Sequence, residues 1–314
     1  MTTDVLTLGE AMASFRVAGR IGFGRPLTPD LAGAESNVAI GLSRLGHSVE
    51  WLGRVGADPF GPEVLRALRA EGVTVSHTVV DETAPTGVMF LEQRTADLTR
   101  VEYRRAGSAG SGLRIDDLWP TAMDRLRVLH LTGITPALSD SAAATVARAA
   151  ELASAAGVLV SLDVNHRSRL WSRDDASATL RPLLPHVTLL VAGVDELDVV
   201  ADGDEDRAVG ELFATGVQQV AVKRGAVGAS LYTTQGRLDA AAIPVTPIDP
   251  VGAGDAFCAG LLSGILDDLD PTARLDRAVL MGAWAVSTAG DWQGLPTRAE
   301  LPDIATHRQG ETVR

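Results

Sequence analysis

Residues Ile248 to Leu262, IDPVGAGDAFCAGLL, constrain the fold most, because a glycine-rich turn, an acid and the start of an apolar helix follow one another there. Glycine lets the backbone turn tightly, and the apolar residues from Ala256 onward predict a buried helix. A helix that begins at such a turn has backbone N–H groups without intrahelical acceptors and a positive dipole end. We therefore expect residues 252–254 to form an anion site, with phosphate as the obvious occupant.

Asp255 lies at the same predicted helix end. A carboxylate in this position is either an N-terminal cap or a general base held beside a bound phosphoryl group. The local residues leave both roles open.

The segment DPVGAGDAF, residues 249–257, resembles the C-terminal signature of the ribokinase (PfkB) family of carbohydrate kinases, usually written D-T-x-G-A-G-D-x-F. It departs from that pattern only at Pro250, where the family usually has threonine. The resemblance implies that Asp255 takes the proton from the sugar hydroxyl. It also implies that the charge on the transferring phosphoryl group is stabilised by the amides of Gly252, Ala253 and Gly254.

Length and composition fit one large globular unit spanning residues 1–314, with 46% hydrophobic and 22% charged residues. Acidic residues number 40 and basic residues 28, and the formal charge of −12 argues against nucleic acid or an anionic membrane as the main partner. The single Cys258 cannot form an internal disulfide and reads as a small core side chain. The N-terminal segment lacks a basic region before its apolar residues, and no apolar run has the length of a membrane span, so we expect a cytoplasmic protein.

Short apolar runs alternate with helical patterns along most of the chain. This alternation predicts a mostly parallel sheet covered by helices on both faces, and the family resemblance implies a three-layer α/β/α fold. In such sheets ligands bind beyond the carboxyl ends of the strands. Strands are predicted at residues 5–8, 49–55, 73–80, 128–131, 158–164 and 187–191, and helices at 36–45, 62–71, 139–156 and 278–288.

Two segments, at about residues 11–30 and 86–106, do not fit the alternation. In the second, GVMFLEQ and TRVEYRR read as two strands separated by the polar turn ADLT, so the two segments together predict a small extra sheet. The resemblance implies that this sheet is a lid over the sugar. Surface hairpins without a role are the alternative. We also expect a homo-oligomer, with the lid as a possible contact.

The sequence AGAESNVAIGLSRLG, residues 32–46, changes from a glycine turn to an apolar helical pattern. It resembles the family's N-terminal signature, which implies that Gly33 and Asn37 contact the sugar hydroxyls. A structural N-cap is the alternative for Asn37.

The lid segment ends in VEYRR, and the strand after Val158 continues into DVNHRSRLW. Tyr103, Arg105 and Arg167 are therefore predicted to meet over the sugar site, where two guanidinium groups suit a carboxylate. If the strand register differs by one residue, Arg104 faces inward instead.

These positions resemble family members that phosphorylate 2-keto-3-deoxygluconate. The resemblance implies transfer of the ATP γ-phosphoryl group to the primary 6-hydroxyl of that sugar acid. Fructokinase, ribokinase and a non-catalytic sugar sensor are the alternatives, and nothing between residues 86 and 105 offers the aromatic sandwich that a nucleoside kinase would need.

A glutamate opens the predicted helix after the strand at 187–191. Glu196 matches the family's N-x-x-E pattern, which implies that it helps to organise Mg²⁺ through water, although Gly193 replaces the asparagine. A solvated glutamate at a helix start is the alternative.

The segment VAVKRGAVGAS, residues 220–230, reads as a strand followed by a K-x-G-x-x-G turn. It resembles the family's nucleotide-phosphate loop at Lys223, Gly225 and Gly228, and Gly290 lies in the region that closes over adenine in the family. Lys223 is the only lysine and does not follow a glycine, so the P-loop pattern G-x-x-x-x-G-K-S/T cannot be written anywhere in this chain. The first strand is followed by GEAMAS, which does not fit a dinucleotide turn.

Overall fold

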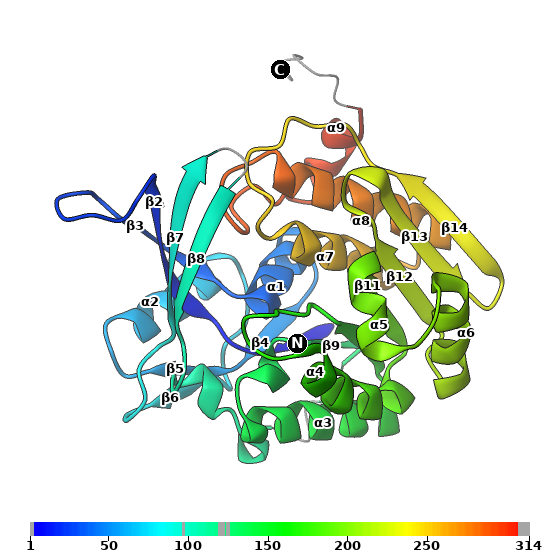
Figure 1. Ribbon diagram of the computed structural model, residues 1–314, viewed down its shortest axis with the longest axis horizontal. Coiled ribbons are helices and arrows are strands. Elements are labelled where there is room, and N and C mark those ends of the chain that lie inside the picture. Colours follow the sequence, from blue (N-terminus) through cyan, green and yellow to red (C-terminus); the bar gives the residue numbers. More distant parts are fainter. Residues whose placement is uncertain (1–2, 96–97, 119–122, 124–125, 307–314) are drawn as a thin grey trace.

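The computed structural model describes residues 3–95, 98–118, 123 and 126–306. An eight-stranded sheet in the order β14-β13-β12-β11-β10-β9-β1-β4 crosses the molecule (Figure 1). Neighbouring strands from β4 to β12 pair in parallel, whereas β13 and β14 are antiparallel additions at one edge. The strands are β1 Val5–Leu8, β4 Val49–Leu52, β9 Val128–Thr132, β10 Leu159–Asp163, β11 Leu189–Gly193, β12 Gln219–Lys223, β13 Gly228–Thr233 and β14 Gly236–Ala241.

Successive strand residues point to opposite faces of this sheet, and apolar residues occupy both faces. Helices therefore cover both faces. Val220 and Val222 of β12 join one apolar cluster, and Ala221 between them joins the other. The first cluster contains α3 Asp140–Ala155, α4 Arg173–Leu180, α5 Leu197–Val200 and α6 Glu205–Thr215. The second contains α1 Ala34–Arg44, α2 Phe60–Ala70, α7 Ala253–Leu266 and α8 Pro271–Val286. The expected three-layer α/β/α fold is confirmed.

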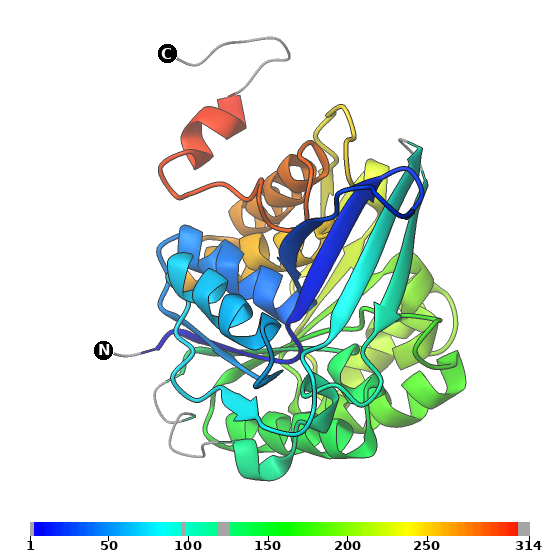
Figure 2. The ribbon, with the colours of Figure 1, turned by 90° about the vertical axis from the view of Figure 1, so that its left-hand side faces the viewer.

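A second sheet of four strands, β3-β2-β7-β8, stands beside the main body (Figures 1 and 2). It is built from β2 Met12–Ala18, β3 Thr28–Ala32, β7 Val88–Thr95 and β8 Leu98–Arg104. The parallel pairing of β2 with β7 joins the two segments that the sequence set apart from the alternation. Residues 96–97 of the predicted ADLT turn lie outside the described residues. We call this sheet the lid sheet.

Several predicted boundaries were wrong. The single strand expected at 49–55 is divided at Gly53 into β4, which pairs with β1, and β5 Arg54–Gly56, which leaves the main sheet. Only glycine fits at the division, since a Cβ on Gly53 would lie 2.3 Å from the Gly9 carbonyl oxygen. The strand expected at 73–80 is reduced to one bridge at Thr74 and the short β6 Val79–Asp81, which pairs with β5.

Two helix starts also differ from the prediction. α8 begins at Pro271, where Asp270 caps the first amides, whereas the prediction began at Ala278. α1 begins at Ala34, which places Asn37 inside its first turn, so the alternative of an N-cap at Asn37 is wrong. The last helix, α9 Leu301–Thr306, is short. None of the helices in the described part of the chain is long and apolar enough to cross a membrane.

Candidate active site

The candidate site lies where the strand order of the main sheet reverses. β1 lies between β4 and β9, so the chain leaves β1 toward one edge for β4 and toward the other for β9 to β12. A crevice forms beyond the carboxyl ends of parallel strands at such a point. A cavity of about 430 Å³ lies there, and side chains from the lid sheet, α1 and the turn before α7 line it.

The predicted glycine turn becomes the N-terminus of α7. Gly252 is the N-cap residue with φ +80, and a Cβ there would lie 2.0 Å from the carbonyl oxygen of Asp291, so only glycine fits. Gly252 and Gly254 line the cavity, and Ala253 is the first helical residue. The helix end therefore presents first-turn amides and a positive dipole to the cavity.

Asp255 lies in the first turn of α7 and lines the cavity, and no side-chain cap bond is made at this helix end. Its Oδ2 accepts a hydrogen bond of 2.8 Å from Asn37 Nδ2. Burial raises the pKa of Asp255 to about 7, although Asn37 and the charge of Arg167 oppose the rise. A carboxylate with a pKa near neutrality is suited to accept a proton from a substrate hydroxyl.

Asn37 and Gly33 connect α1 to the same cavity. Asn37 is 2% exposed, and its Oδ1 atom has no hydrogen-bond partner among the described residues. A ligand hydroxyl could donate to it, since buried amides are normally satisfied. Gly33 is the N-cap of α1, and a Cβ there would lie 2.4 Å from the Glu10 carbonyl oxygen.

Arg105, immediately after β8, is the inward-facing arginine of the lid segment. Arg105 is 8% exposed and forms an ion pair of 2.5 Å with the buried Glu10. Its guanidinium lies 5.1 Å from the ring centre of Tyr103, and its Nε atom has no hydrogen-bond partner in the described part of the chain. Arg104 is exposed and pairs with Glu102. The alternative register is therefore wrong.

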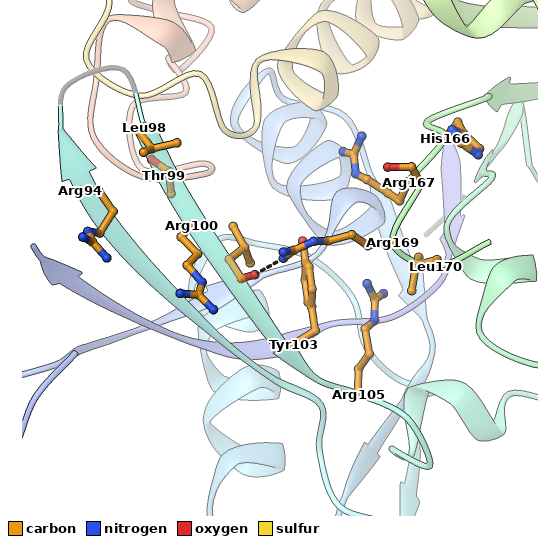
Figure 3. Close-up of a pocket in the computed structure, with 12 residues that line it drawn as sticks. Arg94, Leu98, Thr99, Arg100, Tyr103, Arg105, His166, Arg167, Arg169 and Leu170 are labelled. Atoms are coloured by element: carbon orange, nitrogen blue, oxygen red, sulfur yellow. Dashed lines mark hydrogen bonds between the residues drawn. The ribbon is translucent and has the colours of Figure 1, made fainter. Parts of the chain in front are cut away.

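Arg167 reaches the cavity from the loop after β10 and is exposed. Figure 3 shows Arg105 and Arg167 on facing elements, with Tyr103 near Arg105. The structure thus brings together the three side chains predicted to hold the sugar acid.

Lys223, at the end of β12, lies beneath the α7 turn. Its ammonium donates to both oxygens of Asp163, at 2.9 and 2.7 Å, and a Cβ on Gly254 would lie 3.4 Å from it. Burial alone would lower the pKa of Lys223, but the charges of Asp163 and neighbouring groups raise it well above its ordinary range. Lys223 therefore stays protonated inside the cavity. The thiol of the buried Cys258 also donates to Asp163, at 3.3 Å.

Among the described residues, Gly225 and Gly228 do not line the cavity that Lys223 lines, although the K-x-G-x-x-G pattern contains all three. Residues 225–227 form an exposed 3-10 turn. Val227 is exposed, and its carbonyl accepts from the amide of Ala242, which brings the exposed Ile243 close by. Gly290, with φ +104, donates to Asp249 at 3.4 Å.

Both carboxylate oxygens of Glu196 are held by backbone amides. Oε1 accepts from His166 N at 2.8 Å and Oε2 from Gly193 N at 2.6 Å. Burial and the nearby charge of Asp163 raise the pKa of Glu196. A side chain at 193 would crowd this carboxylate, since a Cβ would lie 3.2 Å from Oε2.

The described residues contain no group of three or more His, Cys, Asp or Glu side chains that could hold a metal ion. Magnesium keeps several waters and usually binds substrate phosphates with one or two carboxylates. Glu196, with lone pairs left on both oxygens, fits contact through water.

Three acidic positions near the site were missed by sequence reasoning. Glu10 lies two residues beyond the end of β1, and Glu35, in the first turn of α1, accepts from the hydroxyls of Thr132 and Thr135, both at 2.6 Å. Burial raises the pKa values of both glutamates. A charged residue just beyond the carboxyl end of a buried strand is the signal that could have found Glu10.

The third missed position is Asp291, which helps to fasten the lid sheet to the α7 turn. Arg16 of β2 binds Asp249 at 2.5 Å and also binds Asp291. Both aspartates are 5% exposed, and the other oxygen of Asp249 accepts from Val251 N at 3.1 Å. These contacts join residues more than 200 positions apart, and no local pattern announces them.

Comparison with known proteins agrees with this geometry. The pfkB family carbohydrate kinase model matches residues 7–298. A 2-dehydro-3-deoxygluconokinase of Bacillus subtilis is 34% identical over 309 residues, covering 96% of this chain and 95% of the relative. A 2-dehydro-3-deoxygalactonokinase of Haloferax volcanii is 34% identical over 272 residues, covering 85% of each. A putative ribokinase II from E. coli, solved with ATP and Mg²⁺, shares the fold with a TM-score of 0.89 at 24% identity, covering 96% of this chain and 99% of that one.

Proposed function

Because the chain belongs to the pfkB family of carbohydrate kinases, we propose that it transfers the γ-phosphoryl group of ATP to the terminal primary hydroxyl, the 6-hydroxyl, of 2-keto-3-deoxygluconate. The observation that carries the substrate is the pair of guanidinium groups, Arg105 and Arg167, that line the cavity containing Asp255. A neutral sugar needs no such pair, whereas a carboxylate accepts paired donors from arginine. The relatives named for 2-dehydro-3-deoxy sugar acids support the same substrate class.

Asp255 is the proposed base in this reaction. It takes the proton of the primary hydroxyl while the hydroxyl oxygen bonds to the γ-phosphorus, and the bond from that phosphorus to the β–γ bridging oxygen breaks to release ADP. Its pKa of about 7 leaves a useful fraction ionised at neutral pH. Asn37 holds the carboxylate in place by its hydrogen bond to Oδ2.

Charge on the phosphoryl group is stabilised in this proposal by the amides of Gly252, Ala253 and Gly254 and by the dipole of α7. Lys223, held by Asp163 beneath the turn, adds a fixed positive charge. Mg²⁺, when bound to the nucleotide phosphates, neutralises further negative charge. Glu196 would hold one of the metal's waters. Gly225, Gly228 and Gly290 would bind the nucleotide outside this cavity, because none of the three is among the described residues that line it. The exposed Val227 and Ile243 would add apolar surface near Gly225 and Gly228.

The lid sheet and the main body would act as one unit over residues 1–314, with the sugar acid enclosed between them. Tyr103 would pack on the acid beside Arg105, and Gly33 and Asn37 would contact its hydroxyl groups. A homo-oligomer with the lid sheet as a contact remains a prediction.

The test measures ADP release with 2-keto-3-deoxygluconate, fructose and ribose, followed by NMR of the product to locate the phosphate. We expect turnover of the acid only, with phosphate on the primary hydroxyl. Efficient turnover of fructose or ribose with the acid inert would overturn the proposal.

A second candidate substrate is the epimer 2-keto-3-deoxygalactonate. The Haloferax volcanii relative named a 2-dehydro-3-deoxygalactonokinase is 34% identical to this chain, as is the Bacillus subtilis relative. Both epimers carry the carboxylate, so Arg105 and Arg167 do not separate them. Direct competition between the two epimers, with kcat/KM measured for each, decides between them.

A further inference from the structure

A second cavity, of about 620 Å³, adjoins the candidate sugar site and shares with it Val101, Tyr103, Arg105 and Arg167. It lies between β8, the free edge strand of the lid sheet, and residues 166–170 of the loop after β10 (Figure 3). We call it the arginine groove, because five arginines line it: Arg94, Arg100, Arg105, Arg167 and Arg169.

No acidic side chain lines the groove among the described residues. Arg105 is paired with Glu10, and Arg94 lies 3.5 Å from a carboxylate oxygen of Glu92. In the described part of the chain, the other three arginines form no ion pair within 4 Å of a carboxylate, although Arg100 lies opposite Glu92 and its charge lowers the pKa of that carboxyl. Arg169 donates to the carbonyl of Val101 at 2.6 Å.

Such a concentration of positive charge is unusual on a chain with a formal net charge of −12. A lone anion would otherwise be repelled by this protein, because net charge of the same sign slows encounter. The groove replaces that repulsion with local attraction at the mouth of the sugar site.

The number of arginines exceeds what one carboxylate needs. The proposed function uses Arg105 and Arg167, and a carboxylate is satisfied by one or two guanidinium groups. Arg94 and Arg100 lie on β7 and β8, toward the far end of the groove in Figure 3. At that position they act on the substrate through their electric field, because charges in water attract one another within the Debye length, which is about 8–10 Å at ordinary ionic strength.

We propose that the arginine groove is an electrostatic capture site for anionic sugar acids, through which the substrate reaches Arg105 and Arg167. This inference rests on the proposed function and adds that Arg94 and Arg100 raise the rate at which the charged acid is captured. Arg169 fastens the lid edge strand to the loop after β10, so it also keeps the groove closed on one side.

The test compares the double variant Arg94→Gln/Arg100→Gln with a matched control, Arg104→Gln. Arg104 lies on the same strand as Arg100, is exposed, and does not line the groove. We measure kcat/KM for 2-keto-3-deoxygluconate and for ATP over a series of NaCl concentrations.

Wild-type kcat/KM for the acid should fall as salt rises. At low salt the double variant should have a kcat/KM for the acid roughly 2- to 5-fold below wild type, with kcat and the KM for ATP kept, and the difference should vanish at high salt. The Arg104→Gln control should follow wild type throughout.

Three results would overturn the inference. The double variant could match the control at every salt concentration, or its deficit could persist unchanged at high salt, which would indicate a change of shape rather than of charge. The third result concerns pyrophosphate, tested as an inhibitor of both proteins. Inhibition of wild type that does not compete with the acid, and that is absent in the double variant, would make the groove an effector site. If wild type does not phosphorylate the acid at all, the proposed function fails too, and that result is visible before any variant is made.

Discussion

Replacing Asp255 with asparagine should abolish most of the activity and at the same time stabilise the fold. The folded pKa of about 7 exceeds the ordinary value of 3.8, so the folded protein binds this proton more tightly than the unfolded chain does. The aspartate is therefore most favourable below its unfolded pKa, and its contribution to stability is lost as pH rises toward the folded pKa.

The size of the effect follows from the shift. About three pKa units at about 1.4 kcal/mol each give a cost of about 4 kcal/mol for ionised Asp255 above neutrality, and about 1.5 kcal/mol at about pH 5. Asparagine keeps the acceptor for Asn37 but brings its own amide into the cavity, so we expect a net gain of about 2 kcal/mol at about pH 8 that largely disappears at about pH 5.

Asp267→Asn provides the control, because it lies at the other end of α7 and shifts in the opposite direction. Burial raises its pKa, but donors from Arg298 and Arg277 outweigh burial and hold it at about 2. Its stabilising contribution is present above the unfolded pKa and is lost as pH falls toward 2, so this variant should lose stability at about pH 8 while keeping activity.

Chemical unfolding at both pH values and ADP release measure the two properties. For Asp255→Asn we expect turnover to fall by about two to four orders of magnitude, with binding of acid and nucleotide retained. In the wild type, kcat/KM should rise with pH through about 7, as Asp255 ionises. A variant that is both near-normal in turnover and no more stable than wild type at about pH 8 would refute the reasoning.

Three further predictions concern charged groups around the site. Arg167→Ala should raise the KM for the acid by about 10- to 100-fold with little change in the KM for ATP. Because the charge of Arg167 lowers the pKa of Asp255, the variant should also show a higher kinetic pKa, and an unchanged pH profile in steady-state kinetics would contradict that role. Glu196→Gln should raise the Mg²⁺ concentration needed for half-maximal rate, and a magnesium titration identical to that of wild type would show that other groups organise the metal. Arg16→Gln should destabilise the protein by about 2–3 kcal/mol at about pH 8, because Asp249 and Asp291 are left buried and charged. Burial raises the pKa of Asp291 to about 6 even with Arg16 lowering it, so loss of Arg16 raises this pKa further, and the deficit in chemical unfolding should shrink as pH falls toward about 6. A deficit independent of pH would argue against this pairing.

The parts of the site that were predictable are those written in consecutive residues. The turn at Gly252 and the helix after it follow from glycine and the apolar run, and both form as expected. The choice between Arg104 and Arg105 was not predictable, because it depends on which face β8 turns to the cavity, and a shift of one residue exchanges the faces. Pairing with β7 places Met89 opposite Tyr103, which puts Arg104 on the exposed face.

Contacts that join distant residues were out of reach for another reason. Glu10 needs Arg105 as its partner, and Arg16 needs Asp249, yet each pair is joined only after the lid sheet has packed against the main body. Asn37 looked like a sugar ligand or a cap, and its hydrogen bond to Asp255 depends on the packing of α1 against α7. Such pairs carry no spacing signal, because the intervening chain does not fix their distance.

Lys223, the one lysine among 28 basic residues, gives the protein an unusual response to amine chemistry. Every other basic side chain counted there is a guanidinium, which keeps its charge at any pH at which proteins are handled. A reagent directed at side-chain amines thus has a single target in this chain, and that target lies beneath the α7 turn beside Asp163. Because the ion pair with Asp163 keeps this ammonium protonated, the side chain should react slowly in the folded protein and readily only after unfolding, with one labelled side chain per molecule. The labelled fraction then becomes a direct count of unfolded molecules.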